Sequence, residues 1–151
     1  MAEPRGVDFS TGISADDAWG RHLGLEMLEV TPERVRARLD AGPRHHQPYG
    51  ILHGGVWCSI VEGVASYGAG VAALARGQKG VVGIANATDF LRSHSTGELL
   101  AESTPLHVGR TQQLWEVRIT RSTDGKLVAR GQVRFQVLEE LPDERRARAR
   151  G

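Results

Sequence analysis

The chain has 151 residues, of which 40% are hydrophobic and 25% charged, and its formal net charge is +1. These values are typical of one soluble globular domain with a single core. The near-neutral charge gives no reason to expect a nucleic acid or a membrane as a partner. The single cysteine, Cys58, excludes an intrachain disulfide framework. The first twenty residues are charged and form no apolar run, so we expect no signal peptide and a cytoplasmic protein.

The first elements predicted are a short helix and two strands. Residues 1–12 lack periodicity and are expected to form a flexible arm. Ser14 can cap a short helix over residues 15–22. Residues 25–30 are typical of a strand, and residues 34–40 alternate apolar side chains with charged ones. That period of two predicts a half-buried strand.

The longest apolar run of the chain follows a loop at residues 41–53. After Gly55 come about five turns of small or apolar residues without a proline, and Gly77 stops them. A helix that is apolar on nearly all sides is usually buried. Only Glu62 carries a formal charge in its middle. A carboxylate in such a helix is costly unless a partner compensates it, so Glu62 is expected to be paired or functional.

The second half of the chain is predicted to be a series of strands. Four apolar segments follow the helix: residues 81–91, 98–108, 111–121 and 127–138. Short polar links favour antiparallel neighbours, and no other long helix is predicted. The economical architecture is an α+β fold, with a curled antiparallel sheet wrapped around one long helix. We expect one domain over residues 13–140 and a disordered charged tail over residues 141–151.

The run from Gln47 to Gly55, Gln-Pro-Tyr-Gly-Ile-Leu-His-Gly-Gly, with Glu62 in the apolar helix behind it, resembles the hotdog-fold acyl-CoA thioesterases. The resemblance is to the phenylacetate-pathway and 4-hydroxybenzoyl-CoA branch, the Arthrobacter-type enzyme in particular, and covers roughly residues 20–138. It implies a hotdog fold and hydrolysis of an aryl or short-to-medium acyl-CoA. No cofactor is implied beyond the coenzyme A of the substrate. The family also forms tetramers as dimers of dimers.

The resemblance also implies roles for individual residues. Glu62 takes the place of the catalytic carboxylate, as nucleophile or general base, and the Gly54 N–H polarises the thioester carbonyl. Further residues expected to orient the thioester, the water or the leaving group are Gln47, His53 and Ser66. Residues expected near the acyl group or the coenzyme A arm are Phe90, Arg92, Arg110 and Thr111.

The spacing of two of these residues predicts an assembly. A helix start offers free N–H groups, and glycine lets a substrate oxygen approach the backbone closely. Gly54 and Glu62 are eight residues apart, roughly 12 Å along a helix, so one helix cannot bring both to one carbonyl carbon. Two antiparallel copies of the helix can, because the start of each then lies beside the glutamate of the other. We therefore expect a homodimer with two composite sites.

Other interpretations remain open at the level of sequence. His53 can simply fix the start of the helix, and Arg92 and Arg110 can be solvated surface charges. His45 and His46 have no further ligand at a usual metal spacing, so no metal site is expected. A hotdog hydratase needs an aspartate–histidine pair that we cannot place. The alternative from another class is a non-catalytic acyl-CoA binding protein, against which the costly Glu62 counts.

Overall fold

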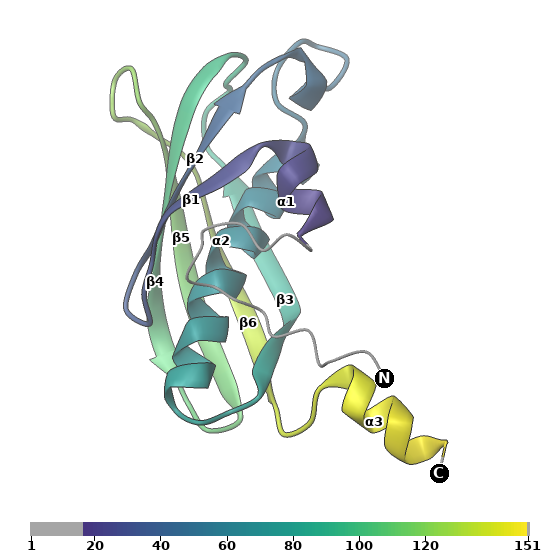
Figure 1. Cartoon of the computed structure of the whole chain (residues 1–151). Coiled ribbons are helices and arrows are strands. Elements are labelled where there is room, and N and C mark those ends of the chain that lie inside the picture. Colours follow the sequence, from purple (N-terminus) through teal and green to yellow (C-terminus); the bar gives the residue numbers. More distant parts are fainter. Residues whose placement is uncertain (1–16, 151) are drawn as a thin grey trace.

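The computed structural model describes residues 17–150. One six-stranded antiparallel sheet, with strand order β1-β2-β4-β5-β6-β3, curls around the long helix α2 (Figure 1). The strands are β1 Leu25–Val30, β2 Val35–Ala41, β3 Gly80–Phe90, β4 Gly97–Val108, β5 Gln112–Arg121 and β6 Leu127–Leu138. The helices are α1 Ala18–Leu23, α2 Gly54–Ala75 and α3 Pro142–Ala149, with a 3-10 turn at Pro43–His45. The architecture expected from the sequence is confirmed.

The core lies between α2 and the concave face of the sheet. Strand β2 alternates buried and exposed residues along its whole length, as its sequence predicts. By length and composition α2 would suffice to cross a membrane, but it packs against the sheet as the core helix of this fold. Its glycines allow close packing: a methyl group at Gly68 would lie 2.5 Å from Cζ3 of the fully buried Trp115.

Helix α1 begins later than predicted. Its N-cap is Asp17, whose Oδ1 accepts the Gly20 N–H at 2.9 Å, so the helix covers Ala18–Leu23 and not residues 15–22. Gly24 ends it in the left-handed conformation, with φ of 76°. Ser14 and the expected arm at residues 1–12 lie outside the described residues.

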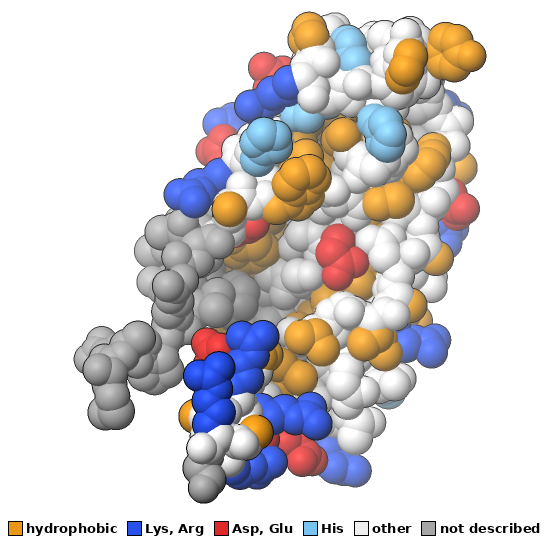
Figure 2. Space-filling model, turned by 90° about the vertical axis from the view of Figure 1, so that its right-hand side faces the viewer, with side chains coloured by type: hydrophobic (Ala, Val, Ile, Leu, Met, Phe, Trp, Pro, Cys, Tyr) orange, Lys and Arg blue, Asp and Glu red, His pale blue; other side chains and the backbone are white. Residues whose placement is uncertain are grey.

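Strand β3 forms an open edge of the sheet. It pairs only with β6, and none of its residues is fully buried. Val82, Ile84 and Phe90 are large hydrophobic side chains that stay exposed on it. Figure 2 views the molecule from the side on which β3 lies and shows hydrophobic side chains spread over this face. An unpaired apolar edge is a surface that can pair with another strand.

The C-terminal segment differs from the expected disordered tail. It forms α3, over Pro142–Ala149, with none of its residues buried. Proline suits the first helical position, and the Leu141 N–H donates to Glu144 Oε2 at 3.0 Å. An ion pair from Lys79 Nζ to Glu144 Oε1, 3.2 Å long, ties the helix to the link between α2 and β3. The high charge of the segment predicted disorder, although Pro142 and Glu144 are local signals for the start of a helix.

Candidate active site

The loop before α2 is held by a network of hydrogen bonds. His45 is buried, its Nδ1 accepts the Gly42 N–H at 3.1 Å, and its Nε2 lies 2.7 Å from the Leu23 carbonyl oxygen. Because one ring nitrogen accepts and the other faces a carbonyl, the proton belongs on Nε2. Arg44 donates to the same carbonyl at 3.0 Å. These bonds fix the loop against the end of α1, and with it the point where α2 starts.

The first turn of α2 leaves one backbone donor free. His53 is the N-cap, and its Nδ1 accepts the Gly55 N–H at 2.8 Å. This is the structural role that the sequence left open for His53, and it leaves Nε2 as a donor in the neutral ring. Among the described residues nothing accepts the Gly54 N–H. A long helix adds the positive end of its dipole at this point, so an anionic oxygen is favoured there.

Four of the predicted residues meet in one pocket beside Gly54. The cavity, of about 330 Å³, is lined by Gln47, Ile51, Leu52, Gly54, Trp57, Phe90, Leu91, Arg92 and Ser93. The Phe90 ring covers Gly54 so closely that a methyl group there would lie 2.7 Å from its Cε2. Gln47 Oε1 accepts the Tyr49 N–H, which leaves the amide NH2 of Gln47 as a donor. Arg92 Nη1 donates to the Leu127 carbonyl at 2.6 Å, so this cation is anchored at the pocket wall.

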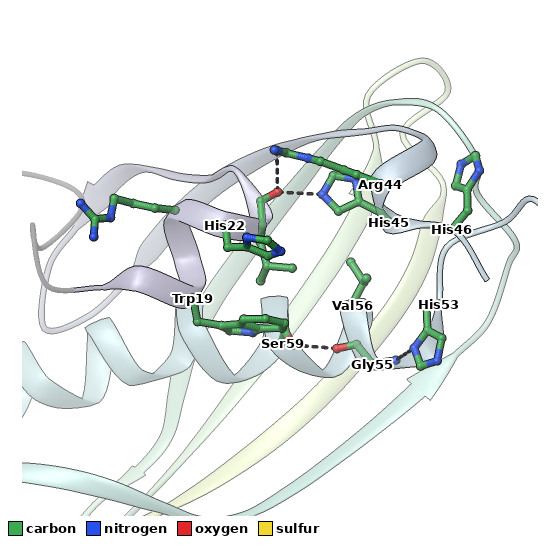
Figure 3. A pocket seen from close by; sticks show the side chains of 11 residues that line it. Trp19, His22, Arg44, His45, His46, His53, Gly55, Val56 and Ser59 are labelled. Carbon is green, nitrogen blue, oxygen red and sulfur yellow. Dashed lines mark hydrogen bonds between the residues drawn. The ribbon is translucent and has the colours of Figure 1, made fainter.

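A second and larger cavity, of about 730 Å³, lies on the other side of the helix start, between α1 and α2 (Figure 3). Its apolar and aromatic lining includes Trp19, His22, Leu23 and Val56. The Trp19 and His22 rings are stacked, with centroids 5.7 Å apart. Among the described residues, its polar lining is cationic or neutral, with no aspartate or glutamate. The cavity suits a planar or apolar group that enters beside Gly55.

Glu62 lies two turns further along α2 and is half-buried. Its Oε2 accepts a hydrogen bond from Asn86 Nδ2 of β3 at 3.0 Å. Ser66 follows one turn later on the same helix and shares that side of the helix with Glu62. Gly54 and Glu62 are on one continuous helix, as predicted, so they remain roughly 12 Å apart within one chain.

Two of the predicted residues lie far from this site within one chain. Arg110 and Thr111 lie in the turn between β4 and β5, where the Arg110 carbonyl accepts from Gln78 Nε2 at 2.9 Å. Gln78 follows the C-terminal end of α2, and a helix of 22 residues is roughly 33 Å long. Within one chain Arg110 and Thr111 therefore lie far from Gly54, and their contact with the coenzyme A arm in a composite site stays a prediction.

The sequence did not single out several residues that surround the site. Asn86 and Thr88 of β3 and Trp19 and His22 of α1 are the main ones. Asn86 and Thr88 alternate as polar residues within an apolar strand, which is the signal that was available. Within residues 17–150, no three His, Cys, Asp or Glu side chains are grouped to hold a metal ion.

Known proteins share the sequence pattern and the fold of this chain. Residues 49–128 match the model of the family described as Thioesterase superfamily. A Mycobacterium tuberculosis protein provisionally named an esterase is 49% identical over 121 residues, 80% of this chain and 86% of that protein. The solved structure of a putative esterase from Mycobacterium tuberculosis has a TM-score of 0.78 at 46% identity, covering 82% of this chain and 98% of its own.

A plant relative carries a more specific name. The 1,4-dihydroxy-2-naphthoyl-CoA thioesterase 2 of Arabidopsis thaliana is 39% identical over 112 residues, which are 70% of this chain and 69% of that protein. The family match covers the end of the loop before α2, the helix itself, β3, β4, β5 and the start of β6. The chain belongs to the thioesterase superfamily, with the hotdog fold, and is a thioester hydrolase.

Proposed function

We propose that the chain hydrolyses an acyl-CoA thioester to a carboxylic acid and coenzyme A. The observation that carries this is the Gly54 N–H at the start of α2, which has no acceptor among the described residues, together with the pocket that Gly54 lines with Gln47 and Arg92. The thioester oxygen binds this N–H, which stabilises the negative charge that develops on the oxygen. Glu62 either attacks the carbonyl carbon or takes a proton from the attacking water, and the thiolate of coenzyme A leaves.

The site is composed of two subunits in this proposal. Gly54 and Glu62 are too far apart on α2 to act on one carbon. The open edge of β3, with exposed Val82 and Ile84, supports a twofold pairing with a second β3. Such a pairing sets the two α2 helices side by side and antiparallel. Each helix start then faces the glutamate of the other subunit.

The larger cavity between α1 and α2 is proposed to take the acyl group. It borders Gly55 and Ser59, immediately beside the proposed oxyanion donor, and has stacked aromatic rings on its wall. Its volume of about 730 Å³ suits an aryl group better than a long flexible chain. An aryl substrate is also what the name of the Arabidopsis relative states for that protein. Membership of the 4-hydroxybenzoyl-CoA branch, a dimer-of-dimers tetramer and a cytoplasmic location are part of the same proposal.

The first experiment measures thiol release from benzoyl-, 4-hydroxybenzoyl-, phenylacetyl-, hexanoyl- and palmitoyl-CoA, with wild type and Glu62→Gln side by side. We expect turnover of an aryl substrate and a loss of kcat in the variant of about 10²-fold or more. If neither protein releases thiol but both bind the CoA esters, the result would support the non-catalytic binding protein instead.

A matched pair of variants tests the oxyanion donor. Gly54→Pro removes the N–H, and proline is tolerated at a first helical position; His53, with ψ of 140°, already has a backbone that suits a following proline. Gly54→Ala adds the same Cβ near Phe90 but keeps the N–H. We expect kcat to be lower in Gly54→Pro than in Gly54→Ala by about 10²–10³-fold. Equal kcat values would exclude this N–H as the donor.

Mixed dimers test the composite site. Glu62→Gln and Gly54→Pro subunits, each inactive alone, form one intact and one doubly altered site when combined. Statistical mixing should restore about a quarter of wild-type activity if each site takes one residue from each subunit. No recovery in dimers verified to be mixed would show that both residues act within one subunit.

A further inference from the structure

We propose that Asn86 and Thr88 of β3 are positioning residues that hold one oxygen of the Glu62 carboxylate and leave the other free to react. This inference rests on the proposed function, because it concerns the carboxylate assigned there. Strand β3 runs alongside α2 (Figure 1), and its side chains reach the helix where Glu62 lies.

The Asn86 amide can have only one orientation. Its nitrogen lies 3.1 Å from the Cys58 carbonyl oxygen and 3.0 Å from Glu62 Oε2. A carbonyl and an ionised carboxylate only accept hydrogen bonds, so the NH2 group must face both of them. One N–H fixes the amide to the helix backbone, and the other holds Glu62 Oε2. A donor bound to an ionised group makes a stronger bond than one between neutral groups.

Thr88 completes the network. Its Oγ1 lies 2.7 Å from Asn86 Oδ1, the only remaining acceptor of the amide. Because that oxygen cannot donate, the threonine hydroxyl donates to it. The order of donation is thus from Thr88 to Asn86 and from Asn86 to Glu62. Each bond in such a chain polarises the next, so the hydroxyl supports the amide as a donor.

The second carboxylate oxygen, Oε1, lies over Gly83. A methyl group at this position would overlap Oε1, so the glycine provides the space that the oxygen occupies. No described group donates a hydrogen bond to Oε1. One oxygen is therefore anchored while the other stays available to a water or a carbonyl carbon.

A β-bulge brings these residues to one face. The pairing of β3 with β6 shifts register between Gly83 and Ala85, which places Ile84 as the extra residue. Without the shift, side chains three positions apart would point to opposite faces. With it, Gly83 and Asn86 both lie against Glu62. The irregularity of the strand thus has a direct consequence for the carboxylate.

The test uses steady-state kinetics on an aryl-CoA that wild type turns over. Asn86→Ala should lower kcat on the order of ten- to a hundredfold, the effect expected for one lost bond to a charged group, with little change in KM. Thr88→Val, which keeps the shape and loses the hydroxyl, should lower kcat less. Thr88→Ser restores the hydroxyl and should recover wild-type kcat.

The decisive measurement combines the variants. If Asn86 acts through Glu62, adding Asn86→Ala to Glu62→Gln should cause no further loss of kcat. A further loss of the same size as in wild type would show that Asn86 merely ties β3 to α2, and would overturn the proposal. So would unchanged kcat in both Asn86→Ala and Thr88→Val. Wild-type activity in Glu62→Gln would instead overturn the role of Glu62 itself, a distinct outcome.

Discussion

Gly68 illustrates how one residue sets the distance between α2 and the sheet. The Trp115 ring lies against its Cα, and Trp115 Nε1 donates to the buried Gln113 Oε1 at 2.7 Å. Gln113 Nε2 in turn donates to the Ala69 carbonyl at 3.2 Å. This buried polar network links β5 to the helix and needs the space that a glycine leaves.

We predict that Gly68→Ala lowers the free energy of unfolding. Alanine is intrinsically the better helix residue by about 1 kcal/mol, but overpacking against a fully buried ring costs about 1–3 kcal/mol. Urea unfolding measures the difference. Gly63→Ala is the control on the same helix, since its methyl would meet only the flexible end of Leu25, at 3.2 Å from Cδ2. Equal changes in the two variants would contradict the role of the Trp115 contact.

The turn between β5 and β6 contains a local ion pair that lowers the pKa of one of its own residues. Arg121 Nη2 lies 2.7 Å from Asp124 Oδ2. The hydrogen bond from Arg121, followed by that from the Lys126 N–H, lowers the pKa of Asp124 from 3.8 to about 2. Because the folded-state pKa is the lower one, the stabilisation is fully present above pH 3.8 and is lost as the pH falls through about 2.

We expect an NMR titration of the Asp124 carboxyl to show a midpoint near pH 2 in the wild type. Arg121→Gln removes the largest cause of the lowered pKa, so the midpoint should move up toward the ordinary value. Arg118→Gln, on the same strand but without a bond to Asp124, should leave the midpoint where it is. An unchanged midpoint in Arg121→Gln would assign the lowered pKa to the backbone of the turn.

At the scale of the whole molecule, the open edge of β3 connects assembly to activity. Ile84 is 52% exposed on this edge, whereas Leu106 is 51% exposed on β4, which lies between β2 and β5. A lysine at an edge opposes strand pairing, because it brings an uncompensated charge into the new interface. The two positions therefore form a matched pair with equal exposure and different places in the sheet.

We predict that Ile84→Lys converts a dimer to a monomer and lowers thioester turnover at least about tenfold, since each composite site loses half of its residues. Leu106→Lys should retain both the dimer and the activity. Sedimentation velocity and thiol release on the same samples give the answer. A monomeric Ile84→Lys protein with wild-type turnover would refute the two-subunit site.

Local pattern alone identified most of the elements and the centre of the site. The apolar run after Gly55 is a helix because no proline interrupts it, and the alternation in β2 is visible residue by residue. The glycine pair at the helix start and the isolated charge of Glu62 stand out in the sequence for the same reason, since helix ends and buried charges have local signatures.

Only the tertiary structure decided which distant residues lie around the helix start and Glu62. The register shift at Gly83 to Ala85 directs Asn86 to Glu62, and no local periodicity encodes a bulge. The position of Arg110 at the far end of α2 follows from strand order. The cavity beside Trp19 exists because α1 packs near the start of α2. The sequence by itself determined the helix, its glycines and its carboxylate, whereas strand register and packing, which depend on contacts between distant segments, determined what surrounds them.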